Sequence, residues 1–166
     1  MNYASILNED FGNGTGVGIT VWVSGCSHHC KGCFSKDLWD YSYGDEWTVE
    51  VEDNFLNLAD KPYISRITLL GGDPLADNNV DSVENLIHKC RVRFGHTKKI
   101  WVYTGYTFEE IVSSGKKSSI QDIDVLVDGR FEEDKKDLTL KFRGSSNQRI
   151  IDVPLSLQSG EVVLYG

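Results

Sequence analysis

The sequence lacks long apolar runs and has little proline, cysteine or methionine. Among 166 residues it has 3 prolines, 4 cysteines and 1 methionine. It has no run of about 18 apolar residues, which argues against a membrane span. Its start lacks the basic, apolar and small-residue order of a signal peptide. We therefore expect a cytoplasmic protein with no membrane association.

Positive charge is also scarce. Lysine and arginine number 17 against 25 acidic residues, for a formal net charge of -8. A general nucleic-acid binder needs a basic face to neutralise phosphates, so we expect no nucleic-acid partner. The hydrophobic fraction of 40% is that of a globular chain. The length suits one domain of ordinary size, and we expect a single domain over residues 1–166.

Three of the few cysteines are crowded into eight residues, as Cys26, Cys30 and Cys33. In a reducing compartment such clusters bind metal or do redox chemistry more often than they form disulfides. A structural zinc site or an ordinary cubane cluster takes four protein ligands. Three thiolates in one loop therefore predict a metal centre with one open position, where a substrate binds.

The fourth cysteine and the loop histidines need their own interpretations. Cys90 lies in a stretch with apolar residues at helical spacing, so we expect a buried structural thiol. His28 and His29 would suit a zinc site with mixed cysteine and histidine ligands, although both side chains can simply face solvent. A thioredoxin-type pair, Cys30 with Cys33, would leave Cys26 unexplained.

Apolar runs and turn residues predict strands that alternate with helices. Strands are expected at 17–24, 66–70, 99–103 and 124–127, with late ones at 149–153 and 162–164 on either side of Pro154. Helices are expected around 51–59, around Cys90, and after a capping box that begins at Thr107 and is closed by Gly115. This alternation predicts an α/β fold with right-handed crossovers and a mainly parallel sheet.

Four sequence features follow directly after predicted strands. They are the cysteine loop at 25–35, the turn Gly71-Gly72-Asp73-Pro74, the turn Thr104-Gly105-Tyr106, and Asp128. Ligands of parallel sheets sit beyond the carboxyl ends of the strands, so we expect these features to form one site. The glycines would let backbone approach a ligand, and Asp73 would pair with its ammonium group. Turn formation and helix capping are the alternatives for Gly-Gly-Asp-Pro, Thr104 and Asp128.

The spacing C-x3-C-x2-C after a first strand resembles the radical S-adenosylmethionine superfamily. Within it, the chain is most similar to the activating proteins of anaerobic (class III) ribonucleoside-triphosphate reductases. Six stretches carry this resemblance and cover almost the whole chain: Asn13–Val17, Cys30–Phe34, Thr68–Leu75, Trp101–Tyr106, Asp124–Phe131 and Arg143–Arg149. Departures include Asp73, where many members have glutamate, and Thr15 and Gly18, where members often have proline and arginine.

The resemblance implies a partial, open parallel β/α barrel that binds a [4Fe-4S] cluster and S-adenosylmethionine. Cys26, Cys30 and Cys33 would hold the cluster. The residues implied in cofactor binding are Gly71, Gly72 and Asp73 at the amino acid end, Gly32, Cys33 and Phe34 near adenine, and Thr104 and Asp128 at the methionine or ribose. No conventional general base is assigned.

The implied reaction is reductive cleavage of S-adenosylmethionine to methionine and a 5'-deoxyadenosyl radical, which makes a glycyl radical on the partner reductase. A low-potential electron donor such as flavodoxin is also implied, and residues 143–166 would face the reductase. An open iron position further implies anaerobic operation. Two alternatives stay open. One is a small-molecule enzyme similar to 7-carboxy-7-deazaguanine synthase, and the other is a non-catalytic zinc-binding module.

Overall fold

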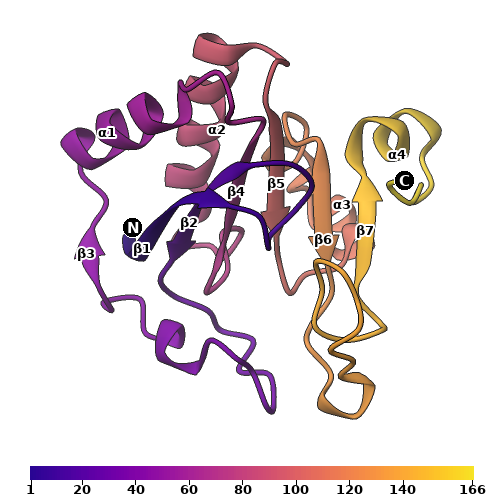
Figure 1. Ribbon diagram of the computed structural model, residues 1–166. Coiled ribbons are helices and arrows are strands. Elements are labelled where there is room, and N and C mark those ends of the chain that lie inside the picture. Colours follow the sequence, from indigo (N-terminus) through magenta and orange to yellow (C-terminus); the bar gives the residue numbers. More distant parts are fainter.

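A computed structural model describes residues 1–166, and its strands form one seven-stranded sheet (Figure 1). The strands run in the order β3-β1-β2-β4-β5-β6-β7. Their bounds are β1 Asn2–Asp10, β2 Gly18–Val23, β3 Asp45–Glu46, β4 Arg66–Gly71, β5 Lys99–Tyr103, β6 Val125–Asp128 and β7 Arg149–Asp152. The central strands β2, β4, β5 and β6 are parallel, whereas β1, β3 and β7 pair antiparallel. The chain is therefore a mixed α/β protein with a parallel centre.

Helices cover one face of this sheet. They are α1 (Val49–Ala59), α2 (Val80–Phe94), α3 (Phe108–Ser113) and α4 (Val153–Ser159). Alternate strand residues such as Val21, Leu69 and Val102 are fully buried under them in a cluster of 24 apolar residues. In Figure 1, α2 lies behind the strands and α1 lies at the upper left. The apolar runs of the central strands thus reflect burial on both faces.

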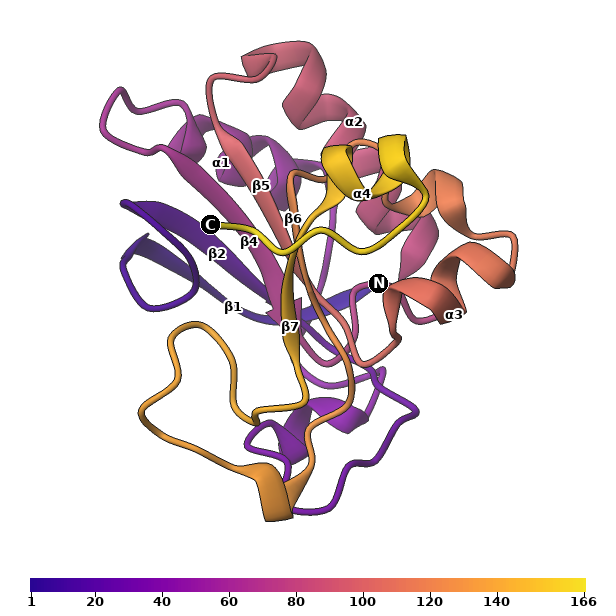
Figure 2. The same ribbon diagram turned by 90° about the vertical axis from the view of Figure 1, so that its right-hand side faces the viewer.

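The opposite face is covered by loops rather than helices. Trp101, Val125 and Val127 are buried there, and Phe142 and Tyr165 pack on them from late loop segments. Figure 2 shows the long segment between β6 and β7 and the chain end lying on this side. No helix of the structure is both long and apolar enough to cross a membrane.

Two predicted helix features are confirmed. Thr107 caps α3 through a full capping box, in which its hydroxyl accepts from Glu110 N and the Glu110 carboxylate accepts from Thr107 N. Cys90 lies on α2 and is 2% exposed, as its helical spacing predicts.

Other expectations about the elements are wrong. Strand β1 was not expected, and the sheet is less parallel than predicted because β1, β3 and β7 run antiparallel to their neighbours. Residues 162–164 form no strand, only a single bridge from Leu164 to Ile151. Pro154 does not separate two strands as predicted but lies in the first turn of α4, since proline fits there, where its missing N–H has no partner to lose.

Candidate functional site

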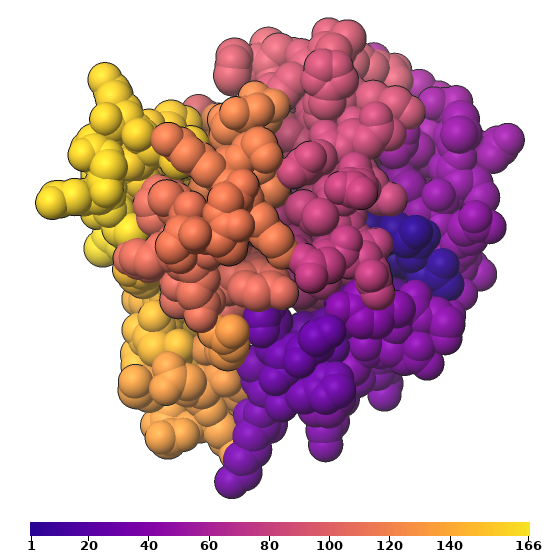
Figure 3. Space-filling model, turned by 180° about the vertical axis from the view of Figure 1, so that it is seen from behind, coloured from indigo at the N-terminus to yellow at the C-terminus, as the bar shows by residue number.

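A cavity opens beyond the carboxyl ends of the parallel strands. Its lining includes Cys26, His28, Cys30, Cys33 and Phe34 from the first loop, Leu70 to Asp73 after β4, and Tyr103 to Gly105 after β5. Val127, Gly129 to Phe131, Arg143, Gly144 and Gln148 complete it around β6 and the segment before β7. Figures 1 and 2 place both long loops below this edge of the sheet. Figure 3 shows their purple and orange residues side by side at the lower end of the molecule.

The cysteine loop is held to the sheet by backbone hydrogen bonds. Gly25 N donates to Leu38 O at 2.8 Å and Cys26 N donates to Trp39 O at 3.2 Å, so the short helix at Lys36–Trp39 supports the loop. His29 has a φ of 50° and stacks on Trp39, with ring centroids 4.4 Å apart. His29 therefore packs on the loop and does not line the cavity.

The three loop thiols share one environment. Cys26, Cys30 and Cys33 all line the cavity, are partly exposed, and form no disulfide. Burial raises the pKa of the Cys26 thiol to about 11 and also raises that of Cys30. A metal must displace these protons, because only thiolates bind it. Cys90 is held apart in the core, where burial raises its pKa to about 12.

Gly71 and Gly72 join the turn after β4 to the start of the cysteine loop. Gly72 N donates to Val23 O at 2.8 Å, and Asp73 N donates to Gly25 O at 2.7 Å. A Cβ on Gly72 would come within 2.5 Å of Gly25 O, and one on Gly71 within 2.5 Å of Val23 O. The glycines therefore have a packing reason of their own, since this turn lies directly against the loop backbone.

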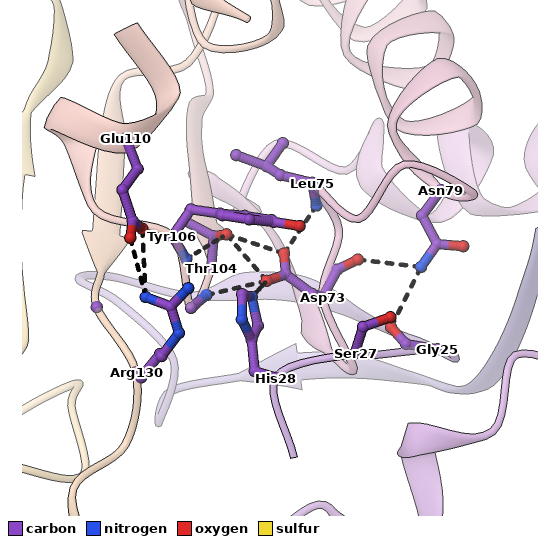
Figure 4. Close-up of polar contacts among 12 residues, drawn as sticks. Gly25, Ser27, His28, Asp73, Leu75, Asn79, Thr104, Tyr106, Glu110 and Arg130 are labelled. Carbon is purple, nitrogen blue, oxygen red and sulfur yellow. Dashed lines mark hydrogen bonds and ion pairs between the residues drawn. The ribbon is translucent and has the colours of Figure 1, made fainter. Parts of the chain in front are cut away.

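Asp73 is buried at the centre of the site, with 1% exposure. Its carboxylate accepts from Leu75 N at 2.9 Å, Thr104 Oγ1 at 2.9 Å, Gly105 N at 3.0 Å and His28 Nε2 at 2.6 Å (Figure 4). These donors come from three separate segments. Asp73 was predicted to pair with the ammonium group of a ligand, but in this structure it pairs with His28 instead. Thr104, also a predicted site residue, lines the cavity and binds Asp73.

His28 is the residue whose part in the site was missed. Its side chain is only 8% exposed and packs against Tyr106 at 4.6 Å between ring centroids, rather than facing solvent. A carboxylate only accepts hydrogen bonds, so His28 Nε2 carries the proton shared with Asp73. A Cβ on Gly105 would meet the imidazole at 2.4 Å, which explains the glycine in this turn. Sequence spacing gave no signal of this pairing.

Asn79, just before α2, is a second residue that sequence reasoning missed. It is 1% exposed, and its side-chain amide donates to Ser24 O and Asp73 O, each at 3.0 Å. Figure 4 shows the amide between the turn after β4 and the start of the cysteine loop. The Asn79 side chain thus links the backbone at the end of β2 to the turn after β4.

The remaining predicted residues divide into two groups. Phe34 lines the cavity, is 64% exposed, and packs on Phe131 at 5.2 Å. Gly32 and Asp128 do not line it. Asp128 faces the helix side, where its carboxylate accepts from Phe108 N and from Arg149. Side chains alternate along β6, so Val127 faces the cavity and Asp128 cannot.

The segment before β7, which was predicted to face the reductase, supplies polar groups to the cavity. Arg143, Gly144 and Gln148 line the cavity, together with Arg130. Gln148 ties this segment to β6, because its amide donates to Gly129 O at 3.0 Å and its oxygen accepts from Gly144 N at 2.8 Å. The lip of the cavity is therefore a turn that side-chain hydrogen bonds hold in place.

Two kinds of metal centre fit parts of the donor set. One ligand atom each of Cys26, His28 and Asp73 lies within 4.8 Å of the others, which would suit a single ion such as zinc. His28 and Asp73, however, are hydrogen bonded to each other. The three unpaired thiols on one cavity, with the fourth cysteine buried elsewhere, fit an iron–sulfur cluster with one iron free of protein ligands.

Comparison with known proteins gives a consistent answer. Residues 12–151 match the family model described as a 4Fe-4S single cluster domain. The chain is 41% identical over 150 residues to the anaerobic ribonucleoside-triphosphate reductase-activating protein of Escherichia coli strain K12, covering 89% of this chain and 96% of that protein. The protein of the same name from Enterobacteria phage T4 is 37% identical over 150 residues, covering 90% and 93%. That of Vibrio cholerae is 39% identical over 152 residues, covering 90% and 97%. The chain therefore belongs to the family of anaerobic ribonucleoside-triphosphate reductase-activating proteins.

Proposed function

We propose that this chain is an iron–sulfur enzyme that activates an anaerobic ribonucleoside-triphosphate reductase by generating a glycyl radical on it. Cys26, Cys30 and Cys33 hold a [4Fe-4S] cluster, and S-adenosylmethionine occupies the cavity beside it. The fold is then an open barrel of the radical S-adenosylmethionine type. The observation that carries the proposal is the lining of one cavity by these three thiols, in a chain whose relatives bear the activase name.

When bound, the cluster would supply one electron to S-adenosylmethionine, and cleavage of its carbon–sulfur bond would give methionine and a 5'-deoxyadenosyl radical. This radical would take a hydrogen atom from a glycine of the reductase. The chain's own residues hold and shield this chemistry. The thiols release their protons and anchor three irons. The Asp73–His28 pair fixes the cysteine loop to the turn after β4. Leu70, Tyr103 and Val127 form an apolar lining that limits water near a reactive radical.

The reductase surface is proposed to be the cavity rim. Arg143, Gly144 and Gln148 border the cavity, and Phe34 is exposed beside them. Strand β7 pairs Arg149 with Asp128 and Asp152 with Val125, so it leads the chain away from the cavity toward the opposite edge. We therefore narrow the partner-facing part of residues 143–166 to residues 143–148. The electron donor is proposed to be a low-potential protein such as flavodoxin.

Anaerobic reconstitution with iron and sulfide tests the proposal. The reduced protein should form 5'-deoxyadenosine from S-adenosylmethionine, and added reductase should acquire a glycyl radical signal in electron paramagnetic resonance. Alanine at Cys26, Cys30 or Cys33 should abolish both products, because each removes one iron ligand. Cys90→Ala is the matched control and should retain them.

The same experiment separates the alternatives. Stoichiometric zinc without iron or sulfide would indicate a zinc-binding module. Deoxyadenosine formed together with a modified small molecule, and no radical on the reductase, would indicate an enzyme similar to 7-carboxy-7-deazaguanine synthase. Normal turnover by the Cys30→Ala variant would contradict the cluster assignment.

A further inference from the structure

Charged side chains in the cavity are few, and only one lacks a counter-ion. The lining contains one carboxylate, Asp73, which His28 already engages. It contains two guanidinium groups. Arg130 pairs with Glu110 at 3.2 Å, as Figure 4 shows. Arg143 has no acidic group within 4.0 Å. Arg143 is therefore the one charged side chain of the cavity lining that forms no ion pair.

Arg143 is also held so that one side of its guanidinium stays free. Nη1 donates to Gln148 O at 2.6 Å and to Ser146 O at 3.4 Å. Nε and Nη2 donate to no protein group. These two nitrogens form a planar edge that matches the two oxygens of a carboxylate. Because Nη1 is anchored, little side-chain freedom remains to be lost when a ligand binds.

The loop around Arg143 is fixed independently of any ligand. Gln148 Oε1 accepts from Gly144 N and Ser145 N, and Asn147 donates to Arg130 O at 2.7 Å. Ser145 is fully buried. These bonds fix the loop that carries Arg143 at the lip of the cavity. In a ligand with both an ammonium and a carboxylate group, the carboxylate could pair with Arg143. The other ionic groups of the cavity, Asp73 and Arg130, already have partners.

We infer that Arg143 binds the carboxylate of the amino acid end of S-adenosylmethionine through its free Nε and Nη2 edge. This inference rests on the proposed function, because it takes S-adenosylmethionine as the ligand of the cavity. It gives the Arg143–Gln148 turn a ligand-binding role beside its proposed place at the reductase surface.

A cycle of two ligands and two proteins tests this assignment. Protein with the reconstituted, oxidised cluster is equilibrated anaerobically with S-adenosylmethionine or with its decarboxylated analogue, so that binding is measured without cleavage. Arg143→Gln should weaken S-adenosylmethionine binding about 10- to 100-fold, as expected for loss of a charged, two-point hydrogen bond. The same variant should bind the decarboxylated analogue about as well as the wild-type protein, within about threefold by additivity.

Two further variants keep the result interpretable. Arg143→Lys retains charge but loses the planar edge, so it should fall between wild type and Arg143→Gln. Lys135→Gln removes a positive charge from the same segment outside the cavity, where Lys135 pairs with Glu132, and should leave both affinities unchanged.

Several outcomes would overturn the assignment. Equal weakening of both ligands by Arg143→Gln would mean that the arginine only supports the loop. Unchanged affinities would mean that the carboxylate is bound elsewhere. In either case wild-type binding of S-adenosylmethionine leaves the proposed function standing. Failure of the wild-type protein to bind S-adenosylmethionine at all would instead remove the proposed function, and this inference with it.

Discussion

The two ends of strand β4 each carry a buried carboxylate, and they are built differently. At the amino end, Asp10 is 5% exposed and pairs with Arg66, the first residue of β4, at 3.0 Å. Beyond the carboxyl end, Asp73 is 1% exposed and pairs with His28 at 2.6 Å. Each carboxylate also accepts several neutral hydrogen bonds, as a buried charge requires.

The difference lies in the counter-group and its surroundings. Arg66 is always charged, fully buried, and also donates to backbone carbonyls of Thr15 and Gly16. The glycine-rich loop closes tightly over it, since a Cβ on Gly18 would come within 2.5 Å of the guanidinium. His28 belongs to the cysteine loop and borders an open cavity. The Asp10–Arg66 pair therefore stabilises the sheet itself. The Asp73–His28 pair instead attaches the cysteine loop to the turn that follows β4.

Removing Arg66 should have the largest effect on stability. Arg66→Met leaves the Asp10 carboxylate buried without its cation, and loss of one partner of a buried pair costs about 3 to 5 kcal/mol. Anaerobic urea unfolding of the wild-type protein and the variant would measure this free energy. The double variant Asp10→Leu/Arg66→Met should recover part of the loss, because no uncompensated charge remains. A loss below about 1 kcal/mol in the single variant would show that the pair behaves like a surface ion pair.

Some strands of the sheet could be predicted from the sequence and others could not. Strands β2, β4, β5 and β6 were predictable because burial on both faces leaves an unbroken apolar run. Strand β1 was not, because most of its residues are exposed or half-buried and its letters do not alternate. The meeting of the cysteine loop with the turns after β4 and β5 followed from topology alone.

Side-chain pairings were beyond the sequence. His28 and Asp73 are 45 positions apart, and nothing in the local spacing indicates that the imidazole turns inward. Asp10 and Arg66 are 56 apart and equally hidden. Asp128 was assigned to the site from its place after β6. Strand alternation, visible in the sequence, puts Val127 on the cavity side and Asp128 on the helix side.

Changing Asp73 to asparagine should have the next largest effect. All four groups around its carboxylate are donors, so an amide nitrogen would face a donor in either orientation. An unsatisfied buried group of this kind costs about 1 to 3 kcal/mol. The iron content after anaerobic reconstitution should also fall, because His28 no longer holds the cysteine loop to the turn as firmly. His28→Gln, which retains a donor, is the control. If the Asp73→Asn variant kept the wild-type iron content, the Asp73–His28 pair would not be needed for cluster binding.

Acid should weaken the amino end in a defined direction. Burial pushes the pKa of Asp10 upward, but hydrogen bonds from Thr20, Gly12 and Asn13 and the charge of Arg66 outweigh it and hold the pKa below its usual 3.8. Stability from this group is therefore fully present above pH 3.8 and is lost as the pH falls through the lowered value.

This loss should be smaller than that caused by removing Arg66, because protonated Asp10 keeps part of its hydrogen bonding. Unfolding free energies measured between about pH 5 and pH 3, with Asp10→Asn beside the wild-type protein, would test it. The variant should be less stable at pH 5 and should lose less stability on acidification. Parallel curves for the two proteins would mean that Asp10 does not titrate differently in the folded state.

The smallest effect is expected at Cys90, which lies away from both carboxylates. It is 2% exposed among the apolar residues of α2 and the sheet, so Cys90→Ala removes one buried sulfur and should cost about 1 kcal/mol. Iron and sulfide contents after reconstitution should equal those of the wild-type protein, whereas Cys33→Ala should lower both with little change in the unfolding of the metal-free chain. A cysteine-to-alanine change thus affects stability at Cys90 and metal content at Cys33, which distinguishes a packing role from a ligand role. If Cys90→Ala lowered the iron content, the fourth thiol would belong to the metal centre, and the open iron position would have to be abandoned.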